Sequence, residues 1–242
     1  MSGAHGPVAI TGARGRPRGI TTVVFDFDDT LADTWAARTS AVRQAFAGAG
    51  VTEPTAEAFM AAARGRPFDK ALDGFDGGRG AALGLFPAYR RAYWLKGPGL
   101  ISLHDGVPEM LEGLASRGMR LGVLTSKTRE MTVEGRRAGA LVEMAELGID
   151  RYFTHVVGFE DVARHKPDPE GLMRLLAALG STPAETLVVG DSASDVLVGR
   201  GAGAWSALAG WGVPPGERDG LAVPDVVVEH PSALLGLLTG SP

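Results

Sequence analysis

The sequence predicts an α/β protein with a doubly wound parallel sheet and a smaller helical unit inserted after the first strand. Strand-like and helix-like segments alternate along most of the 242 residues, which is typical of βαβ units around a parallel sheet. The alternation stops between about 36 and 104, where the sequence is rich in alanine and helical in pattern. We therefore expect a flexible tail over 1–20, a core over 21–35 and 105–242, and a helical unit over 36–104.

The individual elements follow from short apolar runs and from turn residues. Strands of the core are predicted at 23–27, 120–124, 153–157, 187–189 and, as an edge strand, 226–228. Core helices are predicted over 129–147, broken near Gly135 and Gly139, over 170–179, where Gly180 provides a stop, and after Pro231. The inserted unit should contain three helical segments, at 40–51, 54–65 and 86–97.

Composition limits the classes of protein that the chain can belong to. A hydrophobic content of 45% indicates a globular fold, and the formal net charge of −4 gives no general attraction to nucleic acid or to an anionic membrane. The chain has no cysteine, which excludes disulfide scaffolds and thiolate catalysis and suits a reducing compartment. The first 19 residues lack the apolar run of a secretory signal, and no later stretch resembles a membrane span. We expect a cytoplasmic protein.

The most informative segment is VVFDFDDT, in which an apolar strand runs into three acids. Alternation along the strand predicts that Asp26 and Asp28 lie on the same side, with Asp29 next to them. Carboxylates crowded in this way repel one another and lose hydration, so a cation is needed to balance them. Mg²⁺ suits the site best, because it is a hard cation that shares its ligand shell between carboxylates, water and substrate phosphate.

Three later segments supply further groups for binding a phosphorylated ligand. The strand in VVGDSASDV leads to Asp191 and Asp195, at the strand edge where open α/β sheets bind ligands. The strand in LGVLTSK ends at Thr125 and Ser126, whose hydroxyl and amide groups can donate to a phosphoryl oxygen. Lys166 precedes a proline in RHKPDPEGL, and its ammonium can neutralise substrate charge.

These four segments, in this order, resemble the motifs of the haloacid dehalogenase superfamily, and within it the phosphatases related to phosphoglycolate phosphatase. The resemblance implies that Asp26 is the nucleophile that attacks phosphorus and that Asp28 is the general acid and base. It also implies that Thr125 and Lys166 bind the phosphoryl group. A mobile helical cap over the active site is expected at the position of the insertion.

The resemblance also implies a mechanism and a metal site. A small phosphate monoester would be hydrolysed through an aspartyl phosphate on Asp26. Mg²⁺ would be held by the side chains of Asp26 and Asp191 and by the backbone carbonyl of Asp28. Asp195 either binds the metal as well or orients Lys166 or a metal-bound water, and we prefer the second role.

Substrate selectivity is expected to come from the inserted unit. Arg64 and Arg66 lie in a segment whose counterpart faces substrate in related enzymes, and they are predicted to contact a small phosphorylated metabolite. Neither nucleic acid nor a membrane is an expected partner. The chain is expected to be a monomer or a homodimer.

Two alternatives to a phosphatase stay open. A phosphosugar mutase of the β-phosphoglucomutase type uses the same core, but those enzymes carry a histidine where this chain has Arg38. A catalytically silent module that binds a phosphorylated ligand would need none of the catalytic groups. In this chain, however, every catalytic position of the four motifs carries the expected residue. Conversion of a sugar 1-phosphate into its 6-phosphate would identify the first, and a lack of phosphate release would identify the second.

Overall fold

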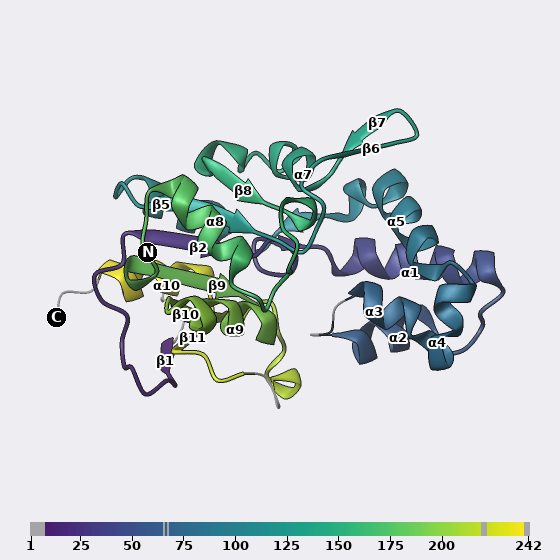
Figure 1. Cartoon of the computed structure of the whole chain (residues 1–242), viewed down its shortest axis with the longest axis horizontal. Helices are drawn as coiled ribbons and strands as arrows, with labels where there is room; N and C mark the ends of the chain where they lie inside the picture. Colours follow the sequence, from purple (N-terminus) through teal and green to yellow (C-terminus); the bar gives the residue numbers. More distant parts are fainter. Residues whose placement is uncertain (1–7, 65, 67, 219–221, 240–242) are drawn as a thin grey trace. The chain divides into compact units, whose positions relative to one another are not determined.

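A computed structural model of the protein describes residues 8–64, 66, 68–218 and 222–239. The chain divides into two compact units, which we call the core unit and the helical unit (Figure 1). Their limits differ from the predicted ones by two residues at each end of the insertion, since the helical unit begins at 34 rather than 36 and its main segment ends at 102 rather than 104. A second segment, 132–138, also belongs to the helical unit, although it is predicted from sequence to lie in the core.

The core unit is built on a seven-stranded sheet that confirms the predicted α/β class. The strand order is β1-β11-β10-β9-β2-β5-β8, and all neighbouring strands are parallel except β1, which pairs antiparallel with β11. The strands are β1 (Val8–Ile10), β2 (Thr22–Phe25), β5 (Arg120–Leu124), β8 (His155–Val157), β9 (Thr186–Gly190), β10 (Trp205–Ala209) and β11 (Val226–Val228). Two separate two-stranded sheets are formed by β3 (Ala32–Asp33) with β4 (Ser102–Leu103) and by β6 (Met131–Val133) with β7 (Arg136–Ala138).

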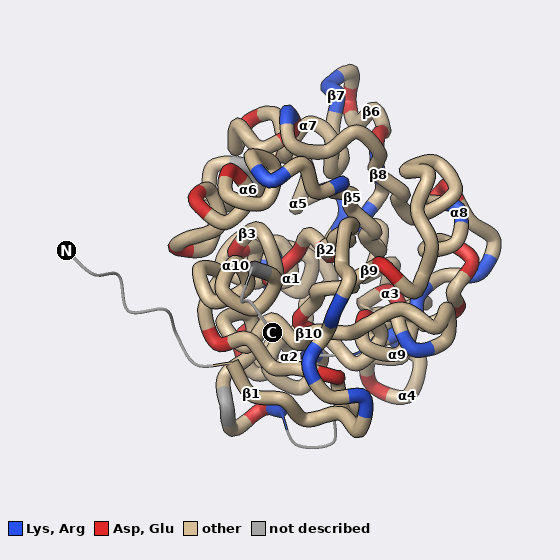
Figure 2. The backbone as a smooth tube through the Cα atoms, turned by 90° about the vertical axis from the view of Figure 1, so that its left-hand side faces the viewer, with Lys and Arg blue, Asp and Glu red and all other residues tan. Residues whose placement is uncertain are grey.

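Helices cover both faces of the sheet. The α-helices of the core unit are α6 (Val107–Ala115), α7 (Ala140–Glu146), α8 (Glu170–Leu179), α9 (Ala193–Ala202) and α10 (Pro231–Thr239). Short 3₁₀ helices are η2 (Asp150–Tyr152), η3 (Phe159–Asp161), η4 (Pro183–Glu185) and η5 (Pro215–Glu217). Helices α8 and α9 lie on one face of the strands, and α6 and α10 lie on the other (Figure 2). Acidic and basic residues are mixed along the traced chain in the same view.

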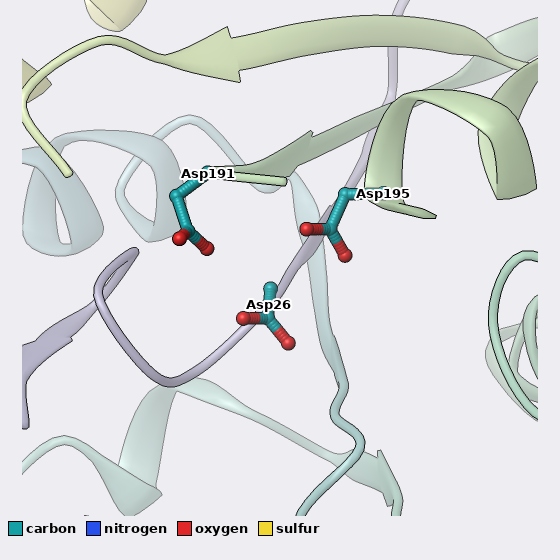
Figure 3. Close-up of side chains that lie close together, drawn as sticks. All are labelled: Asp26, Asp191 and Asp195. Atoms are coloured by element: carbon teal, nitrogen blue, oxygen red, sulfur yellow. The ribbon is translucent and has the colours of Figure 1, made fainter. Parts of the chain in front are cut away.

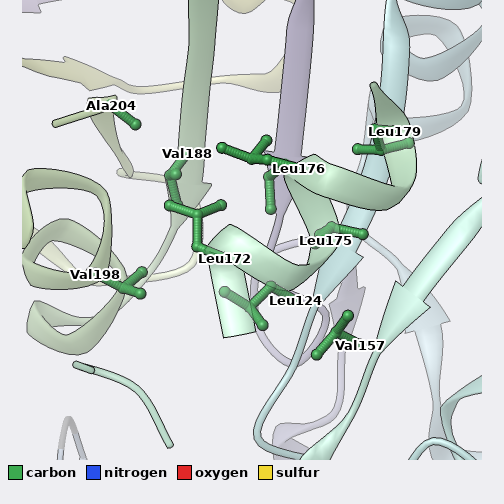
Figure 4. Close-up of a cluster of buried hydrophobic side chains, with 10 residues drawn as sticks. Leu124, Val157, Leu172, Leu175, Leu176, Leu179, Val188, Val198 and Ala204 are labelled. Carbon is green, nitrogen blue, oxygen red and sulfur yellow. The ribbon is translucent and has the colours of Figure 1, made fainter. Parts of the chain in front are cut away.

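Helix α8 is fixed to the sheet by a leucine stripe with helical periodicity. The stripe packs against apolar side chains of β2, β5, β8, β9, α9 and the short connection between α9 and β10 (Figure 4). Its members and their neighbours are Leu172, Leu175, Leu176, Leu179, Val24, Leu124, Val157, Val188, Val198 and Ala204. Because α8 is anchored in this way, the loop that precedes it is held at the carboxyl end of the sheet.

The order of the strands creates a switch point in the middle of the sheet. From β2 the chain proceeds outward through β5 to β8, and it then returns to β9 on the other side of β2 and continues through β10 to β11. Ligands bind in open α/β sheets at the carboxyl ends of the strands where the direction of winding reverses. The carboxyl ends of β2 and β9 are therefore the expected position of a site.

The segment 129–147 corrects the prediction of an interrupted helix. It forms the hairpin of β6 and β7 and only then the short helix α7. Glu134 and Gly135 have φ angles of 49° and 77°, and positive φ at both central residues is the geometry of a two-residue type I′ turn. Gly135 was thus a turn residue between two strands, and the prediction wrongly treated it as a break within one helix.

The described part of the predicted flexible tail is attached to the core unit. Strand β1 pairs with β11, and Arg14 Nη1 donates to the carbonyl oxygen of Ala204 at 2.7 Å while its guanidinium lies 3.9 Å from the ring centroid of Trp205. The prediction of a flexible tail over 1–20 is therefore wrong for these residues, and residues 1–7 lie outside the described part. Strand β11, predicted as an edge strand, is internal, and β1 forms the edge.

The helical unit has an apolar interior formed largely by aromatic rings. Neighbouring rings of Phe46, Phe59, Phe68 and Phe75 lie with centroids 5.2 to 6.1 Å apart. Its elements are α1 (Trp35–Ala49), α2 (Ala56–Ala63), α3 (Phe68–Asp73), α4 (Phe75–Ala82), α5 (Leu85–Lys96) and η1 (Pro98–Leu100). Among the residues that the structure describes, no helix is both long and apolar enough to cross a membrane.

Candidate functional site

Three carboxylates converge at the carboxyl ends of β2 and β9 (Figure 3). Asp26 follows β2, Asp191 follows β9, and Asp195 lies in the first turn of α9. Each residue offers one oxygen, and these oxygens all lie within 4.8 Å of one another. The structure thus brings together acids that are 165 residues apart in the sequence, counted from Asp26 to Asp191.

Direct pairing of β2 with β9 explains this proximity. Phe25 lies opposite Val189 in the parallel register, and the N–H of Asp26 donates to the carbonyl oxygen of Val189 at 2.9 Å, which extends the ladder by one residue. Asp26 is therefore fixed by a backbone hydrogen bond at the end of the strand. Its position coincides with the switch point of the sheet.

Lys166 connects two of the three carboxylates. Its Nζ donates to Oδ1 of Asp26 and to Oδ1 of Asp195, both at 2.6 Å, and to the carbonyl oxygen of Leu124 at 3.2 Å. Its side chain is only 6% exposed. Hydrogen bonds between charged groups are shorter and stronger than neutral ones, so the lysine holds both acids in place.

The site contains more negative charge than Lys166 can neutralise. Burial raises the pKa of Asp26 to about 7; Lys166 opposes this rise, while the carboxylates of Asp195 and Asp28 add to it. Burial alone would lower the pKa of Lys166, but Asp195 and Asp26 more than offset this effect and raise it above its ordinary value. A divalent cation would supply the missing positive charge, and the three carboxylates offer the oxygen donors that Mg²⁺ prefers. The residues present fit such an ion.

Asp195 is held by its own helix terminus as well as by Lys166. Its Oδ2 accepts from the backbone N–H of Ser192 at 3.1 Å and from the Ser192 hydroxyl at 2.5 Å, which forms a capping box at the start of α9. Both of its oxygens are thus engaged by protein groups. These contacts agree with the expectation that Asp195 orients Lys166, a role that stays a prediction.

The loop after Asp26 is fixed by close contacts. Asp29 has a φ angle of 59°, a left-handed conformation that aspartate tolerates better than most residues and glycine tolerates best. A Cβ on Gly212 would lie 1.9 Å from the carbonyl oxygen of Asp29, so only glycine permits this approach. The hydroxyl of Thr30 donates to Oδ1 of Asp191 at 3.2 Å, and Trp211 Nε1 donates to the carbonyl oxygen of Thr30 at 2.8 Å.

Asp28 lies in this loop but its carboxylate is not part of the three-carboxylate group. Its Oδ1 lies 2.8 Å from Nζ of Lys127, and the same Nζ lies 2.5 Å from Oε2 of Glu143 in α7. Neither Lys127 nor Glu143 is predicted from the sequence as a site residue. The spacing of Lys127, two positions after Thr125 in the segment LTSK, could have indicated it. Glu143 carries no such signal, because its position depends on the hairpin that precedes α7.

Thr125 and Ser126 follow β5, as predicted. The N–H of Thr125 donates to the carbonyl oxygen of Val157 at 3.0 Å, and its Oγ1 accepts from the N–H of Lys127 at 3.1 Å. Since the hydroxyl oxygen accepts from the backbone, its own proton can be donated elsewhere. Ser126 is exposed.

The predicted substrate contacts Arg64 and Arg66 belong to the helical unit. Arg64 follows α2, and its guanidinium lies 3.9 Å from the ring centroid of Trp35. Arg66 is exposed. The contact of Arg64 with Trp35 lies within the helical unit. A role of either arginine toward substrate stays a prediction.

The sequence matches a family profile and a named relative over most of its length. A sequence profile described as haloacid dehalogenase-like hydrolase matches residues 23–209. A Clostridium perfringens protein provisionally named pyrophosphatase PpaX is 30% identical over 226 residues, which cover 90% of this chain and 97% of that protein.

Solved structures agree in fold. A haloacid dehalogenase-like hydrolase of Streptococcus pneumoniae superposes with a TM-score of 0.76 at 22% identity and covers 90% of this chain and 98% of that one. A Lactobacillus plantarum protein provisionally described as a phosphoglycolate phosphatase gives a TM-score of 0.72 at 23% identity. The match covers 90% of this chain and 99% of that one. The matched profile spans the four motifs, both strand ends of the site and the helical insertion. The chain therefore belongs to the haloacid dehalogenase-like hydrolase family.

Proposed function

We propose that the protein is a magnesium-dependent phosphatase that hydrolyses a small phosphate monoester through a covalent intermediate. The observation that carries this proposal is the pairing of a buried carboxylate, Asp26, with one lysine inside a group of three carboxylates. The hydrolase family of the chain supports the reaction type.

In the proposed first step, a carboxylate oxygen of Asp26 attacks phosphorus as the bond to the leaving oxygen breaks, and Asp28 donates a proton to that oxygen. In the second step, Asp28 takes a proton from a water molecule, which attacks the aspartyl phosphate and releases inorganic phosphate with Asp26 regenerated. Dividing the reaction into two displacements replaces one difficult step with two easier ones. The proton transfers contribute typically about 10²- to 10⁴-fold.

Charge on the phosphoryl group must be balanced for a carboxylate to approach it. Lys166 and the hydroxyl of Thr125 would bind phosphoryl oxygens, together with backbone and side-chain groups of Ser126. Mg²⁺ bound by the side chains of Asp26 and Asp191 and the carbonyl of Asp28 would add positive charge there. Asp195 would keep Lys166 in position.

The substrate is proposed to be a small phosphorylated metabolite, with Arg64 and Arg66 as contacts to its remaining part. Inorganic pyrophosphate, a phosphoanhydride rather than an ester, is a second candidate, because the Clostridium perfringens relative is provisionally named a pyrophosphatase. The absence of cysteine fits a reducing compartment such as the cytoplasm. We propose a monomer or a homodimer, and neither nucleic acid nor a membrane as a partner.

The decisive experiment measures phosphate release from a panel of esters and from pyrophosphate, with Mg²⁺ and with a chelator. The panel contains p-nitrophenyl phosphate, glycerol phosphate, phosphoglycolate, sugar phosphates and nucleoside monophosphates. We expect magnesium-dependent release of inorganic phosphate from at least one of these compounds, and we expect this release to be abolished in Asp26→Asn. No release from any compound would contradict the proposal and favour the binding module. Conversion of glucose 1-phosphate into glucose 6-phosphate would instead identify a mutase.

A further inference from the structure

We propose that Lys127 and Glu143 form a positioning pair that holds the Asp28 carboxylate for proton transfer and keeps it away from the carboxylate group around Asp26. The inference rests on the proposed function, because it assigns a purpose to Asp28 within that reaction. Lys127 contacts the Asp28 carboxylate directly and Glu143 contacts Lys127, so we place the effect of the pair at Asp28.

The contacts form a line of alternating charge. Lys127 Nζ lies 2.8 Å from Asp28 Oδ1 and 2.5 Å from Glu143 Oε2. It also lies 4.9 Å from the ring centroid of Phe27, a distance at which a cation is attracted to the aromatic face. The side chain of Lys127 is 8% exposed and that of Glu143 is 2% exposed, whereas that of Asp28 is 23% exposed. The outer end of the line is thus the carboxylate that must reach solvent and substrate.

Lys127 is fixed along its backbone as well as at its ammonium. Its N–H donates to Oγ1 of Thr125 at 3.1 Å, and its carbonyl oxygen accepts from the N–H of Phe159 at 2.9 Å. The lysine is therefore attached to the residue that we propose to bind the phosphoryl group. A shift of Lys127 would disturb the relative positions of Asp28 and Thr125.

Glu143 reaches Lys127 because the hairpin returns the chain to its starting point. The N–H of Leu141 donates to the carbonyl oxygen of Arg129 at 3.1 Å, so α7 begins beside the residue where the hairpin departs. Gly139 makes this closure possible: its φ angle is 124°, and a Cβ there would lie 2.5 Å from the carbonyl oxygen of Arg129. A buried carboxylate such as Glu143 requires a charged partner, and Lys127 supplies it.

The chemical need for such a pair follows from the cation that the site attracts. A carboxylate on a short loop beside a divalent ion is drawn to that ion, where it can no longer exchange protons with the leaving group and with water. The ammonium of Lys127, which lies 2.8 Å from Asp28 Oδ1, would compete with that attraction. Glu143 forms a second ion pair with Lys127 and so holds the ammonium in place beside Asp28.

The test uses the full chain with two probes that differ in leaving group. p-Nitrophenyl phosphate needs little protonation of its leaving oxygen, whereas glycerol phosphate needs much. With Lys127→Met we expect kcat on glycerol phosphate to fall by roughly 10- to 100-fold, within the range of general acid–base catalysis, and KM to change less than about twofold. With p-nitrophenyl phosphate, formation of the intermediate stays fast and its hydrolysis slows, so a burst of nitrophenol and a phosphorylated protein detectable by intact mass are expected.

Companion variants separate positioning from folding. Lys127→Arg should restore part of kcat, and Glu143→Gln should reproduce a weaker form of the Lys127→Met effect. The double variant Lys127→Met with Glu143→Leu removes both buried charges and should keep the thermal midpoint near that of the wild type without restoring activity. Lys70→Met replaces a lysine whose side chain is 76% exposed and serves as the matched control without effect.

The inference would be overturned if Lys127→Met left both activities unchanged, or if it lowered both in proportion to the loss of folded protein without a burst. Recovery of full activity in the double variant would overturn it too. A wild-type protein that releases phosphate from no compound of the panel above would remove the proposed function, and this inference with it.

Discussion

Gly190 lies so close to Asp195 that a Cβ at this position would stand 2.3 Å from the carboxyl carbon of the aspartate. The glycine ends β9, and the aspartate occupies the first turn of the helix that follows. We predict that Gly190→Ala displaces the Asp195 carboxylate from Lys166, lowers phosphatase activity by at least about tenfold and lowers the thermal midpoint, because overpacking of a fixed site typically costs about 1–3 kcal/mol.

The matched control is Gly236→Ala in α10. A Cβ at Gly236 meets no atom within 4 Å, and alanine is favoured over glycine in a helix. This variant should be stabilised by about 0.4–1 kcal/mol with unchanged activity. If Gly190→Ala behaved like Gly236→Ala in both denaturant unfolding and kinetics, the close approach would have no consequence for the site.

Lys166→Met is predicted to be damaging to activity and to stability. The substitution leaves Asp26 and Asp195 facing each other without the ammonium that bridges them. Removing one partner of a buried ion pair typically costs about 3–5 kcal/mol, which urea unfolding in the presence of a chelator would measure. Added Mg²⁺ should recover part of this loss, and Lys70→Met should show none of it. Unfolding curves that coincide with the wild type would mean that Lys166 does not stabilise the carboxylates.

Much of the site could be predicted from sequence because its residues lie at the ends of apolar strands. Asp26, Thr125 and Asp191 each follow such a strand, and parallel strands bring their carboxyl ends to one edge of the sheet. Lys166 was recognised from its place in the series of motifs. Its 2.6 Å hydrogen bonds to two acids depend on the packing of α8, which periodicity alone does not provide.

The missed features depend on backbone conformation and on long-range pairing. The type I′ turn at Glu134 and Gly135 is encoded by two residues within a segment whose composition also suits a helix. Strand β1 has three residues and gains its partner only from β11, more than 200 positions later. Lys127 and Glu143 meet only because the hairpin closes. Local patterns cannot report the β1–β11 pairing or the Lys127–Glu143 contact, since each depends on residues that are distant along the chain.

Asp28→Asn and Asp26→Asn should differ in what they remove. Asp28→Asn takes away the proposed proton donor and acceptor, and we predict a decrease in kcat of roughly 10²- to 10⁴-fold. Its effect on Mg²⁺ binding should be small, because the proposed contact from Asp28 is its backbone carbonyl. Asp26→Asn should abolish turnover and weaken Mg²⁺ binding, as measured by titration calorimetry. Unchanged steady-state activity in Asp28→Asn would remove that residue from the role of acid and base.

Deletion of residues 1–12 should destabilise the core unit although it removes no site residue. The deletion exposes the edge of β11 and removes the hydrogen bonds from the N–H groups of Thr11 and Gly12 to the carbonyl oxygen of Asp225, each 3.0 Å long. We expect a lower thermal midpoint with kcat of the folded protein unchanged. Deletion of 1–7 alone keeps β1 and is the control. Equal midpoints for both deletions would show that pairing of β1 contributes nothing to stability.

The raised pKa of Asp26 predicts how stability and Mg²⁺ binding vary with pH. The pKa is about 7 in the folded protein without metal, against an ordinary value of 3.8 in the unfolded chain. Between these two pH values the folded protein holds a proton that the unfolded chain has released, so the free energy of unfolding falls as the pH rises from about 4 to about 7. Above that window this contribution no longer changes with pH.

Mg²⁺ should reverse this loss, because the cation binds the deprotonated carboxylate and competes with the proton. The increase in thermal midpoint on adding Mg²⁺ is therefore expected to be larger at about pH 8 than at about pH 5, measured against NaCl of equal ionic strength. Asp26→Asn removes the titrating group and should flatten the pH dependence of the metal-free protein through the same window. A Mg²⁺-induced increase of the same size at both pH values would contradict the assignment of Asp26 as a metal ligand with a raised pKa. It would mean that no proton on Asp26 competes with the cation at about pH 5.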